Sequence, residues 1–116
     1  MDNEILDLEE FLERVQDDKK LLLELLDIFS QDFKEKRIQM AEAVRNKDMD
    51  QVKKVTHALK GSSGNISAKL LRLTVIRLED MGKNNNLDGA DEALFEMDRK
   101  FEELTGRIAV LKQELS

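Results

Sequence analysis

The stretch DMDQVKKVTHALKGSSGNISA, from Asp48 to Ala68, has the apolar spacing of a helix, yet it holds the only histidine of the chain and two of its five glycines. At about 100° per residue, the apolar side chains that fall on one face are Val52, Val55, Leu59 and Ile66. His57 points roughly 170° away from the middle of this stripe, so we expect its side chain to face solvent.

Two glycines share the exposed strip with His57. Gly61 follows it by one helical turn and Gly64 by two, while Lys60 lies three residues on. A glycine inside a helix costs about 1 kcal/mol relative to alanine, so two on one exposed face indicate a surface that a partner approaches closely. The plainer interpretation is an ordinary surface histidine, with glycines that serve packing or end the helix.

Composition narrows the class of protein. A chain of 116 residues without proline favours one helical domain, and we expect a single domain over residues 1–116. The net charge of −6 argues against nucleic acid or an anionic membrane as the main partner. Since there is no cysteine, disulfides and thiolate chemistry are excluded, and we expect a cytoplasmic protein.

The apolar spacing predicts one short helix followed by four long ones. We expect them over residues 4–15, from Asp17 or Asp18 to about Arg45, from the N-cap Asp48 to about Ser67, over Lys69–Lys83, and through the C-terminal segment. The expected inward residues of the fourth helix from the N-terminus are Leu70, Leu71, Leu73, Thr74, Leu78 and Met81.

The last segment has the most regular pattern. Its apolar residues are spaced alternately three and four apart: Leu94, Met97, Phe101, Leu104, Ile108, Leu111 and Leu115. Such a seam is typical of helix bundles. The sequence therefore predicts an all-α protein, an antiparallel four-helix bundle with a short additional N-terminal helix.

The sequence lacks the residues that several kinds of chemistry require. There is no Walker A or other glycine-rich nucleotide motif, so we expect no ATP binding and no autonomous kinase activity. One histidine and no cysteine leave little for a zinc site, and Lys54 stands where a Glu-x-x-His metal motif would need glutamate before His57. We expect no metal site and no cofactor of the chain's own.

The motif HALKGSS (residues 57–63), followed by NISA (65–68), resembles the signature of histidine phosphotransfer (HPt) domains. The segments DLEEFLERVQDDKKLLLELLDIF (7–29) and LLRLTVIRLED (70–80) also resemble the family, so the likeness covers most of the chain. One position departs from the pattern: Ser67 replaces the glycine of the family's Gly-Ala pair.

The resemblance implies a phosphocarrier in a two-component phosphorelay. His57 would accept a phosphoryl group from a receiver-domain aspartate or a kinase and pass it to a response regulator. Lys60 would offset the charge of the phosphoryl oxygens, and Gly61 and Gly64 would let the receiver reach the imidazole. The partners would be a receiver domain and a sensor or hybrid histidine kinase, and Mg²⁺ would come from the receiver.

Other features of the surface bear on partners. Lys53 and Lys54 flank the same face and would steer an acidic receiver, although solvated lysines explain them equally well. We expect a monomer, because a bundle that buries its own stripes needs no further helix. Two alternatives stay open: an HPt-like substrate domain of a chemotaxis-type histidine kinase, and a helical interaction bundle that is never phosphorylated.

Overall fold

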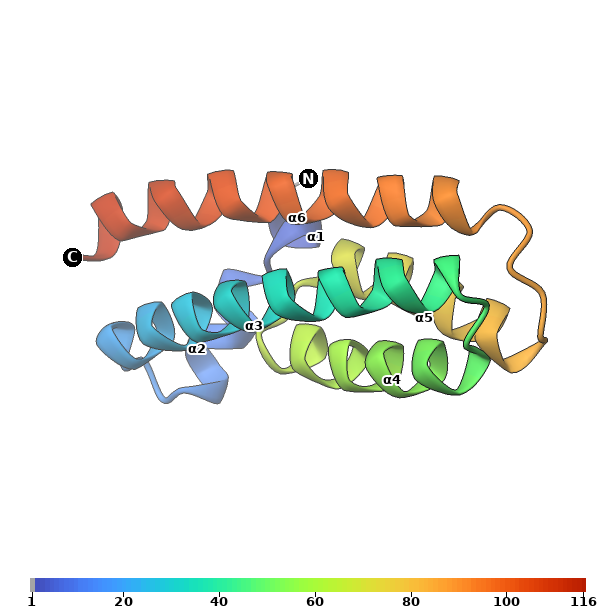
Figure 1. Cartoon of the computed structure of the whole chain (residues 1–116). Helices are drawn as coiled ribbons and strands as arrows, with labels where there is room; N and C mark the ends of the chain where they lie inside the picture. The colour runs from blue at the N-terminus through green and yellow to red at the C-terminus, as the bar shows by residue number, and fades with distance from the viewer. Residues whose placement is uncertain (1) are drawn as a thin grey trace.

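Six α-helices build the chain in the computed structural model, which describes residues 2–116. They are α1 (Asp2–Ile5), α2 (Leu8–Arg14), α3 (Lys19–Arg45), α4 (Met49–Asn65), α5 (Lys69–Lys83) and α6 (Ala90–Leu115). The described residues contain no strand. The four long helices α3–α6 lie alongside one another, with α2 at the end where α3 begins (Figure 1). The all-α class and the bundle with extra N-terminal helical structure are confirmed.

The apolar stripes of the four long helices meet in one core. The seven residues of the α6 seam are buried or packed against it. Phe33 of α3 stacks on Phe101 of α6, with ring centroids 4.1 Å apart. On the surface, the Arg37 guanidinium donates two hydrogen bonds to the Asp98 carboxylate, at 2.6 and 2.8 Å. Apolar packing and this bidentate pair together fix α6 against α3.

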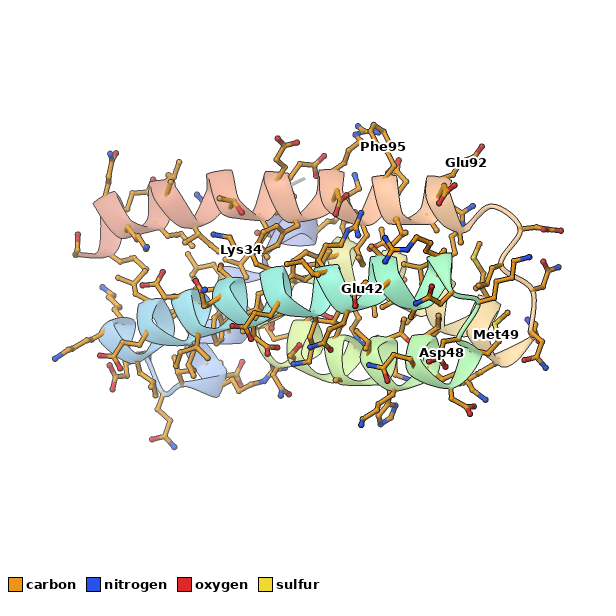
Figure 2. The ribbon with its side chains drawn as sticks, viewed as in Figure 1. Lys34, Glu42, Asp48, Met49, Glu92 and Phe95 are labelled. Carbon is orange, nitrogen blue, oxygen red and sulfur yellow. The ribbon has the colours of Figure 1, made fainter. Side chains whose placement is uncertain are left out.

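Aspartates begin three of the helices. The side chains of Asp7, Asp18 and Asp48 each accept a hydrogen bond from the backbone N–H three residues later. These bonds satisfy donors that have no partner within the helix. Asp48 and Met49 therefore stand at a defined turn between α3 and α4 (Figure 2). The N-cap predicted at Asp48 is confirmed, and it sets where the histidine helix starts.

Ser67, the one departure from the HPt motif, has a backbone conformation that suits glycine. It follows the end of α4 with a φ of +61°, in the left-handed region that glycine adopts most easily. The Ser67 and Ala68 N–H groups donate back to the carbonyls of Gly64 and Ser63, at 3.0 and 2.9 Å. Ser67 thus occupies the position that stops the helix, at a conformational cost of about 1 kcal/mol relative to glycine.

Two sequence-based expectations were wrong. The helix expected over residues 4–15 is broken, because Asp7 caps α2 and its backbone N–H donates to the Ser67 carbonyl at 3.0 Å. Leu73, expected to face the core, is 60 % exposed, whereas Val75 is buried. The apolar run in α5 is wider than its buried face, so residue type alone did not distinguish the two positions.

A polar network fastens α2 to the end of α4. Arg14 donates to the carbonyls of Gly64 and Asn65, at 2.9 and 2.6 Å. The Ser67 hydroxyl donates to Glu10 at 2.7 Å. Lys69 lies 3.2 Å from the same glutamate and 3.1 Å from the Asp7 carboxylate. The carbonyls that α4 leaves open are therefore partly satisfied by the N-terminal region.

Acid should weaken this junction. The hydrogen bond from the Glu10 N–H holds the pKa of Asp7 below its usual value, and the Ser67 hydroxyl and Lys69 ammonium do the same for Glu10. Their stabilisation is therefore present above the unfolded-state pKa, near 4, and is lost as the pH falls through the lowered folded values. Urea unfolding at several values between about pH 6 and 3 should show a shallower loss of stability for Lys69→Met than for the unaltered chain. Equal slopes would contradict the assignment.

Candidate functional site

His57 lies on the outer face of α4, where its side chain is 79 % exposed. The imidazole Nδ1 lies 3.6 Å from Oε2 of Glu79, a residue of α5 whose side chain is only 4 % exposed. Lys60, one turn after His57, donates to Glu79 Oε1 at 2.8 Å, and the Lys83 ammonium lies 3.5 Å from the same oxygen. One buried carboxylate thus connects the histidine with two cations.

Glu79 is ionised at neutral pH in spite of its burial. The hydrogen bond from Lys60 is the largest effect and lowers the pKa of the Glu79 carboxyl, and the charges of Lys60 and Lys83 act in the same direction. Burial opposes them and raises the pKa, but it is the weaker influence. The site therefore presents a fixed negative charge on the Nδ1 side of the ring, and a proton on Nδ1 would leave the Nε2 lone pair open.

The close approach of α5 to α4 brings these groups together. Gly82 is buried, and a Cβ at this position would lie 3.0 Å from Val52 Cγ1 and 3.1 Å from Lys53 Cγ. A larger residue there would force these neighbours to move away. Glu79 and Lys83 lie within one turn of Gly82, so this contact places both beside the histidine helix.

The two glycines predicted to clear space for a partner have different surroundings. A Cβ added to Gly61 would meet no atom within 4 Å, so the surface beside His57 is open there. A Cβ added to Gly64 would lie 3.2 Å from Nε of Arg72, and the Gly64 carbonyl accepts the hydrogen bond from Arg14. Gly61 has the predicted surroundings, whereas Gly64 lies partly under an arginine side chain. The docking role of both stays a prediction.

The flanking lysines lie as the helix period requires. Lys54 is exposed, and Lys53 is half-exposed with its ammonium 3.5 Å from the Asp50 carboxylate. The stem of Lys53 also packs against α5 at Gly82. Lys53 is therefore partly structural, and partner steering by the two lysines stays a prediction.

Sequence reasoning missed Glu79, Lys83 and Gly82. A usable signal existed, because Glu79 falls on the apolar stripe of its helix beside Val75 and Leu78. A carboxylate on a core face is rare unless it is paired, so that position could have been marked as part of a site.

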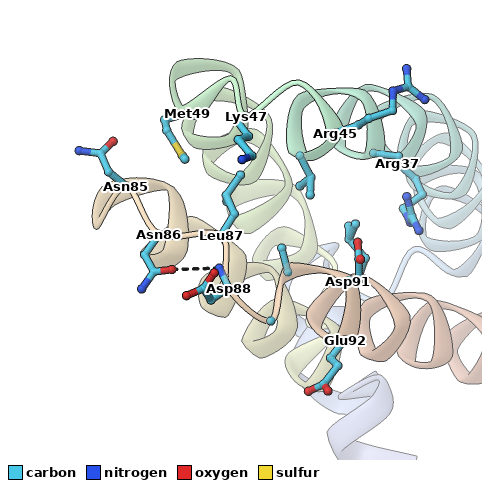
Figure 3. A pocket seen from close by; sticks show the side chains of 15 residues that line it. Arg37, Arg45, Lys47, Met49, Asn85, Asn86, Leu87, Asp88, Asp91 and Glu92 are labelled. Atoms are coloured by element: carbon cyan, nitrogen blue, oxygen red, sulfur yellow. Dashed lines mark hydrogen bonds between the residues drawn. The ribbon is translucent and has the colours of Figure 1, made fainter.

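Two other features of the molecule bear on its chemistry. Within residues 2–116, no three histidine, aspartate or glutamate side chains are grouped so that they could hold a metal ion. A hollow of about 980 Å³ lies where α3 ends and α6 begins (Figure 3). Arg45 and Lys47 line one part of it and Asp88 and Asp91 another, and none of the histidine-site residues contributes to it. The hollow is thus separate from the histidine site.

No helix within residues 2–116 has the length and apolarity needed to cross a bilayer.

Known proteins match the chain along most of its length. The model of the Hpt domain family matches residues 24–114. Among solved structures, the histidine-containing phosphotransfer protein B (HptB) from Pseudomonas aeruginosa PAO1 superposes with a TM-score of 0.83 and 25 % sequence identity. That match covers 95 % of this chain and 93 % of the other. None of the curated proteins matches the sequence.

Proposed function

The chain belongs to the Hpt domain family and has a histidine phosphotransfer role in a phosphorelay, and on that premise we propose that His57 is the residue that carries the phosphoryl group. The observation that carries the proposal is the position of the imidazole. The only histidine of the chain is exposed on α4, with Nδ1 toward a buried carboxylate and a lysine one turn away. An exposed, oriented imidazole is the nucleophile that phosphotransfer requires.

The transfer step uses the two ring nitrogens differently. The Nε2 lone pair attacks phosphorus, the Nε2–P bond forms, and the P–O bond to the donor aspartate breaks, which returns that aspartate to its carboxylate form. The proton on Nδ1 stays in place, so the phosphorylated ring is positively charged. Glu79 lies where it can accept the Nδ1–H and offset this charge. Lys60 lies where it can stabilise the phosphoryl oxygens.

The proposal includes the exchange partners and the limits of the activity. The acceptor and donor are a response-regulator receiver domain and a sensor or hybrid histidine kinase, with Mg²⁺ held by the receiver. The chain acts in the cytoplasm as a monomeric carrier, without nucleotide chemistry of its own. Lys53 and Lys54 favour encounter with the acidic pocket of a receiver.

Phosphoryl uptake tests the proposal directly. Purified protein is mixed with phosphoramidate, or with a phosphorylated receiver domain, and followed by ³¹P NMR. We expect a stable resonance that survives base and disappears in acid, as a phosphohistidine does. Because the chain has one histidine, such an adduct reports on His57 alone. Absence of the resonance with the small donor and with several receivers would reject the proposal.

Glu79→Gln should slow uptake without removing either lysine. The amide keeps the shape of the side chain but carries no charge, so it cannot offset the positive charge that develops on the ring. We expect the rate of uptake from phosphoramidate to fall about tenfold or more. The exposed Glu102, on α6, provides the control variant Glu102→Gln, which should react at the unaltered rate. Equal rates for both variants would mean that Glu79 does not act on the imidazole.

Gly61→Leu should separate docking from chemistry. A leucine would project into the open space beside His57, where we place the receiver surface. We expect transfer from a phosphorylated receiver to slow about tenfold, since a contact displaced by about 1 Å is costly at a reacting centre. Uptake from phosphoramidate, which is small enough to pass the leucine, should stay unchanged. Loss of both activities, or of neither, would contradict the docking assignment.

A further inference from the structure

Glu79 has two cationic partners but needs only one for charge balance. Lys60 is the nearer, at 2.8 Å, with a side chain that is 26 % exposed. Lys83 lies 3.5 Å from the same oxygen, and its side chain is 57 % exposed. Two ammonium groups beside one carboxylate leave one positive charge in excess.

Phosphorylation of His57 would bring a second anion close to Lys60. The incoming phosphoryl group has oxygens that compete with the carboxylate for the nearest ammonium. If Lys60 turned to the phosphoryl group alone, Glu79 would lose its 2.8 Å hydrogen bond while its side chain stays only 4 % exposed. An unpaired buried carboxylate is strongly unfavourable. The charged ring of phosphorylated His57 faces Oε2, so it is Oε1 that loses its donor when Lys60 moves, and the other cation near Oε1 is Lys83.

We propose that Lys83 is a positioning residue that takes over the pairing of Glu79 when Lys60 turns to the phosphoryl group on His57. Three observations support this exchange. Lys83 lies within 4 Å of the carboxylate oxygen that Lys60 contacts. Its side chain is 57 % exposed, so a change of rotamer that shortens this distance meets solvent over much of its surface. Its backbone is anchored beside α4 by the Gly82 contact, so the movement needs no change in the helices. The inference rests on the proposed function of His57.

The phosphoryl group itself can report the exchange. The protein is loaded with phosphoramidate, so that the Nε2–P bond forms as the P–N bond of the donor breaks and ammonia leaves. The ³¹P chemical shift is then followed against pH over the range in which the adduct survives, and its midpoint measures proton uptake by the phosphorylated imidazole. A nearby ammonium favours the form with fewer protons and moves the midpoint to lower pH. The variants are Lys60→Met, Lys83→Met, the double variant, and Lys83→Arg.

We expect Lys83→Met to raise the midpoint by about half a pH unit, because Lys60 then stays with Glu79. Lys60→Met should raise it similarly, and the double variant should rise no further than Lys60→Met. Lys83→Arg should have the same midpoint as the unaltered chain. Lys112→Met is the matched control, since Lys112 is half-exposed and pairs with Asp27 at 2.7 Å on another surface. It should titrate as the unaltered chain does.

The results that would reject the proposed function differ from those that would reject the exchange. An unaltered chain that takes up no phosphoryl group would reject the proposed function itself. If the unaltered chain is loaded but Lys83→Met keeps its midpoint, Lys60 serves both anions alone and the exchange is wrong. Additive shifts in the double variant would also overturn it, because Lys83 would then act on the phosphoryl group independently. Circular dichroism of the exposed Lys83 variants verifies that the helices remain.

Discussion

Replacing His57 with glutamine should abolish phosphoryl uptake and leave the fold almost unchanged. The amide cannot act as the nucleophile, and the chain has no second histidine to replace it. The side chain is 79 % exposed, so its loss should change the free energy of unfolding by no more than about 0.5 kcal/mol. The comparison requires ³¹P NMR after phosphoramidate treatment and urea unfolding on the same preparations.

The result separates two roles for this residue. A variant that takes up phosphate would place the acceptor on another side chain, such as an aspartate, and would reject His57 as the phosphoacceptor. A variant that loses uptake together with several kcal/mol of stability would show that the imidazole supports the fold. Binding of a receiver to His57→Gln should persist, because the surface around Gly61 that we propose for docking remains.

Gly82→Leu should destabilise the bundle by about 2–4 kcal/mol. Even a Cβ at this position would lie 3.0 Å from Val52 Cγ1 and 3.5 Å from the backbone nitrogen of Lys53, so a full side chain must push α5 away from α4. Overpacking of this kind costs about 1–3 kcal/mol, and the lost burial of neighbouring side chains adds to it. Urea unfolding monitored by circular dichroism measures the effect.

Gly106 provides the matched control on α6. A Cβ there would meet no atom within 4 Å, so Gly106→Leu should stabilise the chain by about 0.5–1 kcal/mol through helix propensity. Opposite signs for the two substitutions would establish that Gly82 serves helix packing. A neutral Gly82→Leu would show that α4 and α5 tolerate separation, and the account of how Glu79 reaches the histidine would then need revision.

Most of the fold could be predicted because its local signals agree. The bounds of α5 and the seam of α6 follow from spacing alone, and Asp48 provides both a turn and a cap. The break at Leu6 and Asp7 could not be predicted in this way, because it depends on a hydrogen bond to Ser67, sixty residues away in the chain. Signals within one helix are readable from sequence, whereas this contact exists only after the helices pack.

The candidate site also has one part that the sequence predicts and another that depends on packing. His57, Lys60 and Gly61 lie on one helix, so a helical wheel places them correctly on one face. Glu79 and Lys83 come from the neighbouring helix, and their approach depends on Gly82, whose role is visible only in the packed structure. The motif therefore identified the proposed nucleophile but not the carboxylate that lies beside it.

The open space at Gly61 has a consequence for how this chain would respond to selection. Gly61 and Gly106 both lie in helices where a side chain would meet nothing, so a laboratory screen for heat resistance alone should replace both. A screen that also demands signalling should replace Gly106 and retain Gly61. The glycine that survives the second screen but not the first would identify the part of the surface kept for a partner.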